Sequence, residues 1–329
     1  MTTRRTTLKL LAGGALPALL ALPAAHAQQP PPLRQLTIVV AFPAGGATDA
    51  VARLVAEGLR GKYAETVIVE NRVGGGGRIG AVHVKNSPPD GSMLLFGPAF
   101  PMAIFPHIYK TLPYDPLTDF VPVATTSKGA FALSVGPAVP ASVRTVADFN
   151  AWAKANPDKA TYGAPAGGGQ HFSGALFAQK AGIPLRMVPY KGGAPSVVDV
   201  LGGHIASVVT PLPEVLQHVK DGKLRMLATT TERRSPFTPD VPTMKELGYD
   251  VVFQDWSGFL APARTPPELV ARANAAINEA VASPKVAAAL KAQGTDVDTN
   301  SPAEFARLYR QAWERYRDVV EATGFKAED

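Results

Sequence analysis

Residues 36–59 read LTIVVAFPAGGATDAVARLVAEGL, and this segment decides the fold class. It opens with the apolar run Leu36–Val40, which is typical of a strand covered on both faces. A turn with two glycines follows at Phe42–Gly46. From Thr48 to Lys62 the apolar residues recur at helical spacing, which predicts a helix. A strand, a turn and a helix in this order are typical of an α/β protein.

The same order of elements recurs along the chain. The predicted strands cover 36–40, 67–70, 93–96, 121–126, 131–135, 161–163, 185–188, 205–209, 224–229, 251–254 and 257–260. The predicted helices cover 48–62, 79–85, 102–108, 145–156, 170–180, 195–201 and 213–221, with two more in the tail. Thr145, Thr265 and Ser301 each precede an acidic residue by three positions, which predicts three capping boxes. Since no long linker divides the chain, a domain boundary should fall at crossing strands, either 131–135 or 257–260.

Length and composition are compatible with about two domains. The chain has 329 residues, is 46% hydrophobic and contains no cysteine. The absence of cysteine excludes a disulfide scaffold, thiolate catalysis and cysteine-ligated metal sites. The formal charge of +6 suggests nucleic acid, but the basic residues are dispersed and no basic run alternates with aromatics. No nucleic-acid partner is therefore predicted.

The first 27 residues have the layout of an export signal. Arg4, Arg5 and Lys9 precede the apolar run 10–22, which is too short to span a bilayer of about 30 Å. Ala25-His26-Ala27 is typical of a cleavage site. The paired arginines resemble a twin-arginine export motif, and an ordinary secretory signal is the alternative. Either signal predicts a mature protein in the periplasm, after loss of three positive charges.

Several common motifs for catalysis or cofactor binding fail. Gly75–Gly80 matches G-x-G-x-x-G, but the strand predicted at 93–96 is not followed by the acidic residue that would hold a ribose. Phosphate-binding, serine-hydrolase and zinc-protease motifs are absent. The histidines are scattered, so neither a metal nor a cofactor is predicted. His171 and Ser173 are two positions apart on a predicted helix and do not face each other, which makes a hydrolase the weaker alternative.

Three glycine-containing loops connect a strand to a helix and could carry ligand chemistry. They are Phe42–Asp49, Gly163–His171 and Val188–Pro195. A helix start offers free N–H groups and a positive dipole end, which favour an anion such as a carboxylate. A plain turn with an exposed first helical turn is the alternative for each loop.

Two charged residues in these loops have more than one possible role. Asp49 could pair with an amino group of a ligand or cap its helix. Lys191 could neutralise a ligand carboxylate or lie solvated at the surface.

Ordered segments of the chain resemble the Bug family of periplasmic solute receptors for tripartite tricarboxylate transporters. The segments include IVVAFPAGGATD at 38–49, VENRVGGGGRIGA at 69–81, YGAPAGGGQHFSGALF at 162–177, VPYKGGAPSVVDVLGG at 188–203 and WSGFLAP at 256–262. The similarity begins near residue 34 and continues to the C-terminus.

This resemblance implies an α/β fold of the type II periplasmic-binding class, with two lobes of mostly parallel sheets joined by two crossing strands. Residues 33–128 plus 254–329 would form one lobe and 129–253 the other. The implied function is capture of a small carboxylate in the cleft, by a monomer without enzyme activity, and its delivery to a membrane permease. The implied carboxylates are dicarboxylates, tricarboxylates, amino acids and aromatic acids. A sensory receptor that docks on a two-component kinase is the alternative.

The resemblance also implies a set of ligand-binding positions. They are Phe42, Ala44, Gly45, Gly46, Thr48, Asp49, Ala99, Ala166, Gly167, Gly168, Gln170, His171, Tyr190, Lys191, Gly192 and Gly193. Small hydroxyl residues are frequent in the family where this chain has Gly168-Gly169-Gln170, so the far end of the ligand is not implied.

Overall fold

The computed structural model describes residues 1–2, 31–292 and 294–327. Residues 32–329 form one compact unit, called the body below. The predicted export signal at 1–27 lies outside the described residues except for its first two. Within the described ranges, no helix combines the length and the apolar character needed to cross a membrane.

The body is built on a mixed sheet in the strand order β2-β1-β3-β9-β4-β7-β5-β6, with β8 and β10 also paired to β4. The strands are β1 (Leu33–Val40), β2 (Ala64–Asn71), β3 (Met93–Pro98), β4 (Phe120–Val135), β5 (Thr161–Pro165), β6 (Arg186–Tyr190), β7 (Ser207–Pro211), β8 (Arg225–Thr229), β9 (Gln254–Pro262) and β10 (Asp296–Val297). The helices are α1 (Ala47–Leu59), η1 (Gly75–Gly77), α2 (Arg78–Lys85), α3 (Phe100–Ala103), α4 (Phe105–Ile108), α5 (Val146–Ala155), α6 (Gly169–Ala181), α7 (Gly193–Leu201), α8 (Leu212–Lys220), α9 (Pro267–Ala282), α10 (Pro284–Ala292) and α11 (Pro302–Thr323).

Different strands form the parallel and the antiparallel pairs of this sheet. The parallel pairs, β1 with β2 and β3 and β5 with β6 and β7, are joined by crossover connections that contain helices. Every antiparallel pair involves β4 or β9. The predicted α/β class is correct, and the two long strands account for the mixed character of the sheet.

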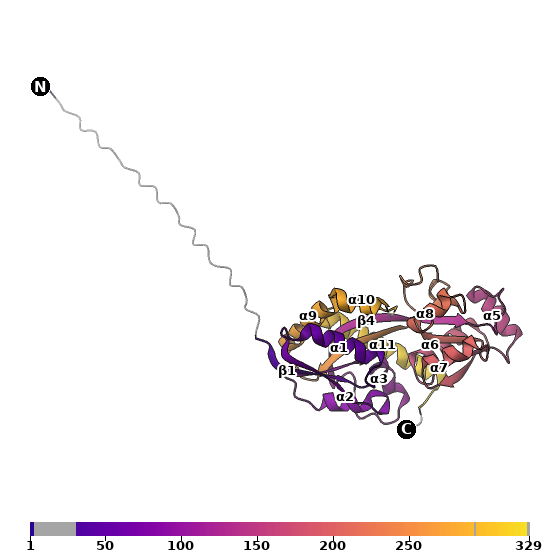
Figure 1. Ribbon diagram of the computed structural model, residues 1–329, viewed down its shortest axis with the longest axis horizontal. Helices are drawn as coiled ribbons and strands as arrows, with labels where there is room; N and C mark the ends of the chain where they lie inside the picture. The colour runs from indigo at the N-terminus through magenta and orange to yellow at the C-terminus, as the bar shows by residue number, and fades with distance from the viewer. Residues whose placement is uncertain (3–30, 293, 328–329) are drawn as a thin grey trace. The chain divides into compact units, whose positions relative to one another are not determined.

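Strands β4 and β9 carry the chain between the two halves of the body. Residues 120–130 of β4 pair with β9, whereas residues 131–135 pair with β7 and β8. Figure 1 shows β4 between α1 and α9 at one end and α5 and α6 at the other. The separate strands predicted at 121–126 and 131–135 are thus one strand. The lobe limits at 128/129 and 253/254 stay a prediction.

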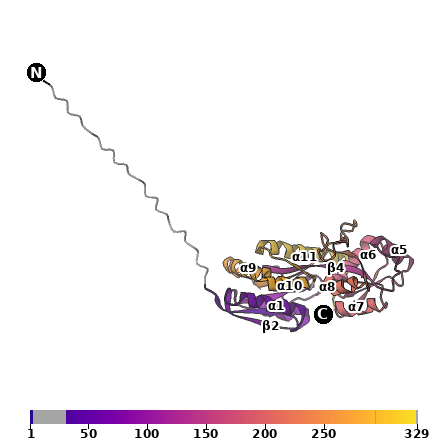
Figure 2. The ribbon, with the colours of Figure 1, turned by 45° about the horizontal axis from the view of Figure 1, so that its top comes forward.

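The buried core consists of several clusters that follow the helices. Helices α1, α9 and α10 pack together on the half that contains β1 (Figure 2). In the other half, the cluster around Phe149 and Phe172 also includes Ile108 of α4 and Val320 of α11. The end of the last helix therefore packs with residues far from it in the sequence, and this packing positions Tyr316 next to α6.

Two local predictions differ from the structure. Thr265 does not cap α9, because its hydroxyl donates to Pro262 O and the N-cap residue is Pro266. The helix predicted at 102–108 is two short helices that meet at Ile104, because Pro101 and Pro106 each begin a new turn. The capping boxes at Thr145 and Ser301 are present as predicted.

Candidate functional site

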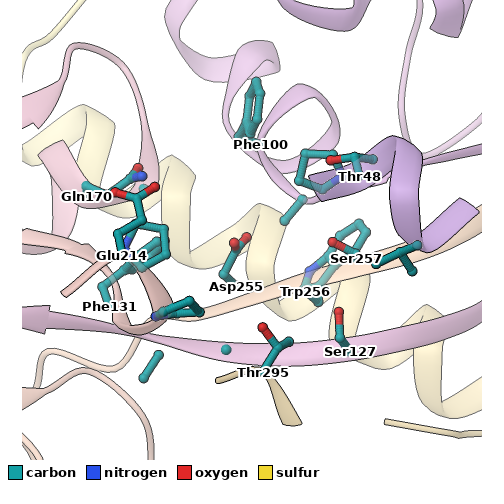
Figure 3. A pocket seen from close by; sticks show the side chains of 18 of the residues that line it. Thr48, Phe100, Ser127, Phe131, Gln170, Glu214, Asp255, Trp256, Ser257 and Thr295 are labelled. Atoms are coloured by element: carbon teal, nitrogen blue, oxygen red, sulfur yellow. The ribbon is translucent and has the colours of Figure 1, made fainter. Parts of the chain in front are cut away.

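A cavity of about 390 Å³ lies over the middle of the sheet and is lined by residues from early, central and late parts of the sequence (Figure 3). Its wall combines helix starts with the central part of β4 and β9. The lining residues are Thr48, Val51, Phe96, Pro98, Ala99, Phe100, Ser127, Gly129, Ala130, Phe131, Gly169, Gln170, Pro211, Pro213, Glu214, Asp255, Trp256, Ser257, Leu290, Thr295 and Tyr316. The wall therefore has a large apolar share and a small set of polar side chains, as is usual for a ligand site.

Three of the predicted site residues line this cavity directly: Thr48, Ala99 and Gln170. Two others lie against its wall. The Phe42 ring contacts Phe100 edge-on at a centroid distance of 5.7 Å. A side chain at Gly193 would collide with the carboxylate of Glu214. The structure thus brings parts of all three predicted loops to one cavity.

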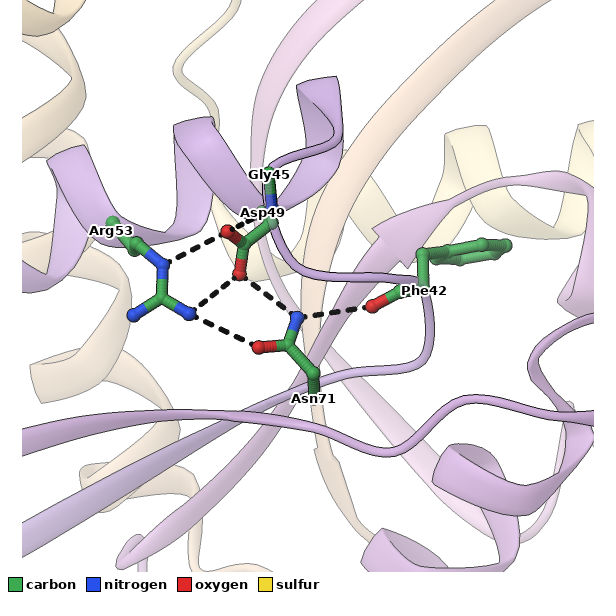
Figure 4. Close-up of polar contacts among 5 residues, drawn as sticks. All are labelled: Phe42, Gly45, Asp49, Arg53 and Asn71. Carbon is green, nitrogen blue, oxygen red and sulfur yellow. Dashed lines mark hydrogen bonds and ion pairs between the residues drawn. The ribbon is translucent and has the colours of Figure 1, made fainter.

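Asp49 is buried and held by several partners (Figure 4). Its carboxylate accepts hydrogen bonds from Arg53 Nε and Nη2, each at 2.9 Å. Gly45 N and Asn71 Nδ2 also donate to it, each at 2.9 Å. The Arg53 hydrogen bond is the main cause that lowers the pKa of Asp49 to about 2.

These contacts place Asp49 in the scaffold of the first loop. Its carboxylate is not part of the cavity wall, and the N-cap of α1 is Gly46, which has no side chain. Asn71 in addition donates to Phe42 O at 3.0 Å. Asp49 therefore fixes the loop that contains Ala44, Gly45 and Gly46, all three of which are exposed.

The second loop is held by His171, which is buried rather than exposed in a first helical turn. Its Nδ1 accepts a hydrogen bond from Gly167 N at 3.3 Å. Burial lowers the pKa of His171 to about 4, so the ring is neutral near pH 7 and can act as this acceptor. Gly167 has φ +73°, a conformation that favours glycine. Ala166 is exposed, and Gly168 is the N-cap of α6.

The third loop turns its polar groups away from the cavity. The Tyr190 hydroxyl donates to Asp199 Oδ2 at 2.6 Å, and burial with the Asp199 contact raises the pKa of Tyr190 to about 12. Lys191 is exposed at the surface. Gly192, at φ 134°, is the N-cap of α7. Neither Tyr190 nor Lys191 lines the cavity.

Helices α1 and α6 begin at the cavity without a capping side chain. Their N-cap residues are Gly46 and Gly168, and neither provides a side-chain hydrogen bond. Helices α5 and α11 instead have complete capping boxes at Thr145 and Ser301. Because a helix start has N–H groups without intrahelical partners, glycine caps leave these donors available at the cavity.

Besides Ser127, Ser257 and Thr295, four polar residues of the cavity wall were not predicted from the sequence. Glu214 follows β7 in the first turn of α8, Asp255 and Trp256 lie on β9, and Tyr316 lies on α11. The loop before α8 has Pro211 and no glycine, so a search for glycine turns missed it. The available signal for Asp255 is an acidic residue just before the WSGFLAP segment, between the predicted strands 251–254 and 257–260.

Both acidic residues of the wall have raised pKa values. Burial raises the pKa of Asp255 to about 6. Burial, and in addition the charge of Asp255, raise the pKa of Glu214 to about 7. Glu214 is exposed, yet the surrounding protein is close enough to disfavour its charge. Among the described lining residues there is no lysine, arginine or histidine.

Ser173 and His171, the residues of the weaker hydrolase alternative, have separate hydrogen-bond partners. The Ser173 hydroxyl donates to Gln170 O at 3.2 Å, while His171 accepts from Gly167. No group of three or more metal-ligating side chains occurs among the described residues.

Comparison with known proteins adds a family model and close relatives. The model of the tripartite tricarboxylate transporter family receptor matches residues 51–325. The chain is 36% identical over 298 residues to protein BugT of Bordetella pertussis, which covers 90% of this chain and 91% of BugT. The model describes receptors and not enzymes.

Solved structures support the same assignment. An R. palustris protein with adipate is 33% identical, with a TM-score of 0.76 over 90% of this chain and 99% of that one. The periplasmic binding protein BugD is 30% identical, with a TM-score of 0.73 over 90% and 100%. MatC of Rhodopseudomonas palustris, with bound malate, is 27% identical, with a TM-score of 0.72 over 88% and 99%. The predicted α/β binding-protein fold is therefore confirmed.

Proposed function

Because the chain belongs to the tripartite tricarboxylate transporter receptor family, we propose that it captures a small carboxylate and delivers it to a membrane permease. Its membership confirms the Bug-family resemblance and the prediction that the chain is not an enzyme. The relatives with adipate and with malate support a carboxylate as the ligand. The signal-like segment at 1–27 supports export to the periplasm, where such a receptor would act.

The observation that carries this proposal is the pair of uncapped helices at the cavity. Thr48 of α1 and Gly169 of α6 line it, and both helices start at glycine. Each helix has 13 residues, so its start carries a positive dipole end of about half a charge. Backbone N–H groups at such starts bind carboxylates without a lysine or arginine.

Capture by the two halves of the body would also require movement. We propose that β4 and β9 act as the hinge between the predicted lobes, 33–128 plus 254–329 and 129–253. Strand β9 pairs with β3 and with β4, and β4 in turn pairs with β7, so these two strands link β3 to β7. Closure would exclude water and strengthen the charged hydrogen bonds to the ligand.

A thermal-shift screen followed by calorimetry tests the function. The expected result is that at least one small mono-, di- or tricarboxylate raises the melting temperature in a concentration-dependent way. Free ligand at 100 times Kd should stabilise the fold by about 2.7 kcal/mol. Small-angle scattering of the same complex should show a smaller radius of gyration than the free protein. A broad panel without any binder would contradict the proposal.

Thr48→Val is the matched variant for the site. It keeps the shape of the side chain and removes a hydroxyl that lines the cavity. We expect binding to weaken several-fold, which corresponds to roughly 1 kcal/mol for one hydrogen bond. Thr66→Val, at an exposed position of β2, is the control and should bind like the wild type. Equal affinity of both variants would remove Thr48 from the binding site.

A further inference from the structure

Two acidic side chains face the cavity without a cation. Figure 3 shows the carboxylates of Glu214 and Asp255 turned toward the same space. Neither forms an ion pair with a described residue, and no basic side chain is among the described lining residues. Lys128, which lines an adjoining cavity, is paired with Asp298 at 2.6 Å. The negative charge of the wall is therefore uncompensated.

A second group in this wall also lacks a partner. Tyr316 is only 4% exposed and lines the cavity. Its hydroxyl lies against Gly169 and forms no hydrogen bond with any described residue. The hydroxyl is not among the buried side-chain atoms without a partner, so it opens into the cavity and is available to a polar ligand atom. The neighbouring Trp256 contributes a buried indole N–H that is likewise unpaired among the described residues.

The acidic pair and the tyrosine belong to one electrostatic group. The charge of Asp255 contributes to the raised pKa of Glu214 and to that of Tyr316, which stays protonated at all physiological pH values. Burial opposes the ionised form of both carboxyls, and for Glu214 the charge of Asp255 adds to this when the site holds no cation. A bound cation would remove this cost.

The positive dipole end at the start of α6 does not outweigh the negative charge of Asp255 and Glu214. A helix start contributes about +0.5 of a charge. Asp255 with a pKa of about 6 is largely ionised at pH 7, and Glu214 with a pKa of about 7 is about half ionised. The sum remains negative next to Tyr316. On the opposite side of the cavity, Thr48 marks the start of α1 (Figure 3), where no acidic residue lines the wall.

Resting on the proposed carboxylate receptor, we infer that the ligand is a zwitterion whose cationic nitrogen binds Asp255, Glu214 and the Tyr316 hydroxyl. Its carboxylate binds at the start of α1. A primary ammonium group has three donors and no acceptor, which matches two carboxylates and a hydroxyl. The amino-acid class of ligand follows from this arrangement, with Asp255 and Glu214 as the residues that select it. Asp49 has no such role, since Arg53 and Asn71 occupy its carboxylate.

Matched pairs of ligands test the inference by calorimetry on the mature protein. The pairs are succinate with 4-aminobutyrate, adipate with 6-aminohexanoate, and glutarate with glutamate. In each of the first two pairs, a CH₂–NH₃⁺ group replaces one carboxylate group. We expect an amine-bearing compound to give the tightest binding of the set, by at least tenfold over its partner. Diacids that bind tighter than the amines in all pairs would overturn the inference and leave the carboxylate function intact. No binding by any compound would count against the carboxylate function itself.

Neutral variants identify the residues. Glu214→Gln and Asp255→Asn should each weaken the amine-bearing compound at least tenfold and leave its diacid partner unchanged or tighter. Glu268→Gln is the matched control, because Glu268 is an exposed acid in the first turn of α9. Circular dichroism confirms folding, and Glu214→Gln alone decides the question if Asp255→Asn does not fold. Equal losses for both ligands, or no loss, would overturn the assignment.

The release or uptake of protons on ligand binding gives a further test, independent of the variants. A cation lowers the pKa of both carboxyls, so its binding at pH 6.5 should release protons. A second carboxylate would instead bind to protonated acids and take protons up. Calorimetry in two buffers of different ionisation enthalpy measures the sign. Glu214, Asp255 and Tyr316 are the titratable groups that line this cavity. Release supports the inference, and uptake overturns it.

Discussion

Asp49, Asp255 and Glu214 differ in their partners, and the partners set their chemistry. Asp49 accepts four hydrogen bonds, and its pKa falls to about 2. Asp255 and Glu214 have no basic partner, and their pKa values rise to about 6 and 7. One carboxylate therefore supports the scaffold, whereas the other two remain available to a ligand. Residue type alone does not distinguish these roles.

The network around Asp49 should contribute to stability. Asp49→Asn removes the charge that Arg53 and Gly45 N contact. The lowered pKa corresponds to roughly 2 kcal/mol at pH 7, as an upper value because Arg53 is half exposed. We expect the variant to unfold at a lower urea concentration, with ligand affinity reduced only through the loop.

The pH dependence of this effect has a definite sign. Because the folded pKa of Asp49 lies below its ordinary value of 3.8, the contribution is complete above about pH 4. It is lost as the pH falls toward 2. The stability difference between wild type and Asp49→Asn should shrink over this range. Asp158→Asn, at an exposed position, is the control and should match the wild type. A difference that stays constant down to pH 2 would contradict the assigned cause.

Helix starts are the elements that form the site, and the absence of capping side chains distinguishes them. At α1 and α6 glycine stands where α5 and α11 have Thr145 and Ser301. A threonine at Gly46 or Gly168 would satisfy the N–H groups internally and compete with a ligand. A lower local stability at these starts is consistent with their proposed role in binding.

The sequence predicts elements and loops well because their signals are local. Each of these signals is formed by residues only a few positions apart. They are the strand and helix periodicity, the glycine turns and two capping boxes. The cavity wall is different, since Tyr316 reaches Gly169 only through the packing of α11 against α6. Asp255 and Glu214 likewise meet through the sheet and not along the chain. Of the predicted site residues that line the cavity, Thr48 and Gln170 lie in loops that carry the family motifs, and Ala99 follows the predicted strand 93–96.

The contact between α6 and α11 makes Gly169 a sensitive position. A Cβ atom there would lie 2.5 Å from the Tyr316 hydroxyl and 2.8 Å from the Phe131 ring. Gly169→Ala should therefore displace one of these rings, at a cost of roughly 1–3 kcal/mol in the free energy of unfolding. We expect a lower melting temperature and weaker ligand binding.

Gly129→Ala is the matched control for Gly169→Ala. Gly129 also lines the cavity, but a Cβ atom there has no neighbour within 4 Å. This variant should keep the wild-type melting temperature. Tyr316→Phe combined with Gly169→Ala should recover part of the lost stability, because it removes the closest contact. Identical behaviour of the two alanine variants would contradict the steric explanation.

In the whole molecule, strands from the segments 33–128 and 254–329 lie in the same half of the sheet. Strand β9 comes from the last third of the sequence, yet it lies between β3 and β4. Its Phe259 packs on Phe96 of β3, with ring centroids 4.5 Å apart. The two segments of the predicted first lobe are thus interdependent, although more than 100 residues separate them.

This topology predicts that residues 33–253 cannot fold alone. Such a fragment ends before β9 and also loses α9 and α11, so β3 and β4 lack the strand between them. The apolar residues that face Phe259 and Trp256 would be exposed to water, and the sheet would present unpaired edges. We expect the fragment to be insoluble, or to lack cooperative unfolding when followed by circular dichroism. Co-expression with residues 254–329 should restore a soluble complex that binds the same ligand as the intact chain. A fragment 33–253 with a cooperative transition and native-like spectrum would show instead that the first half of the sheet folds without its central strand.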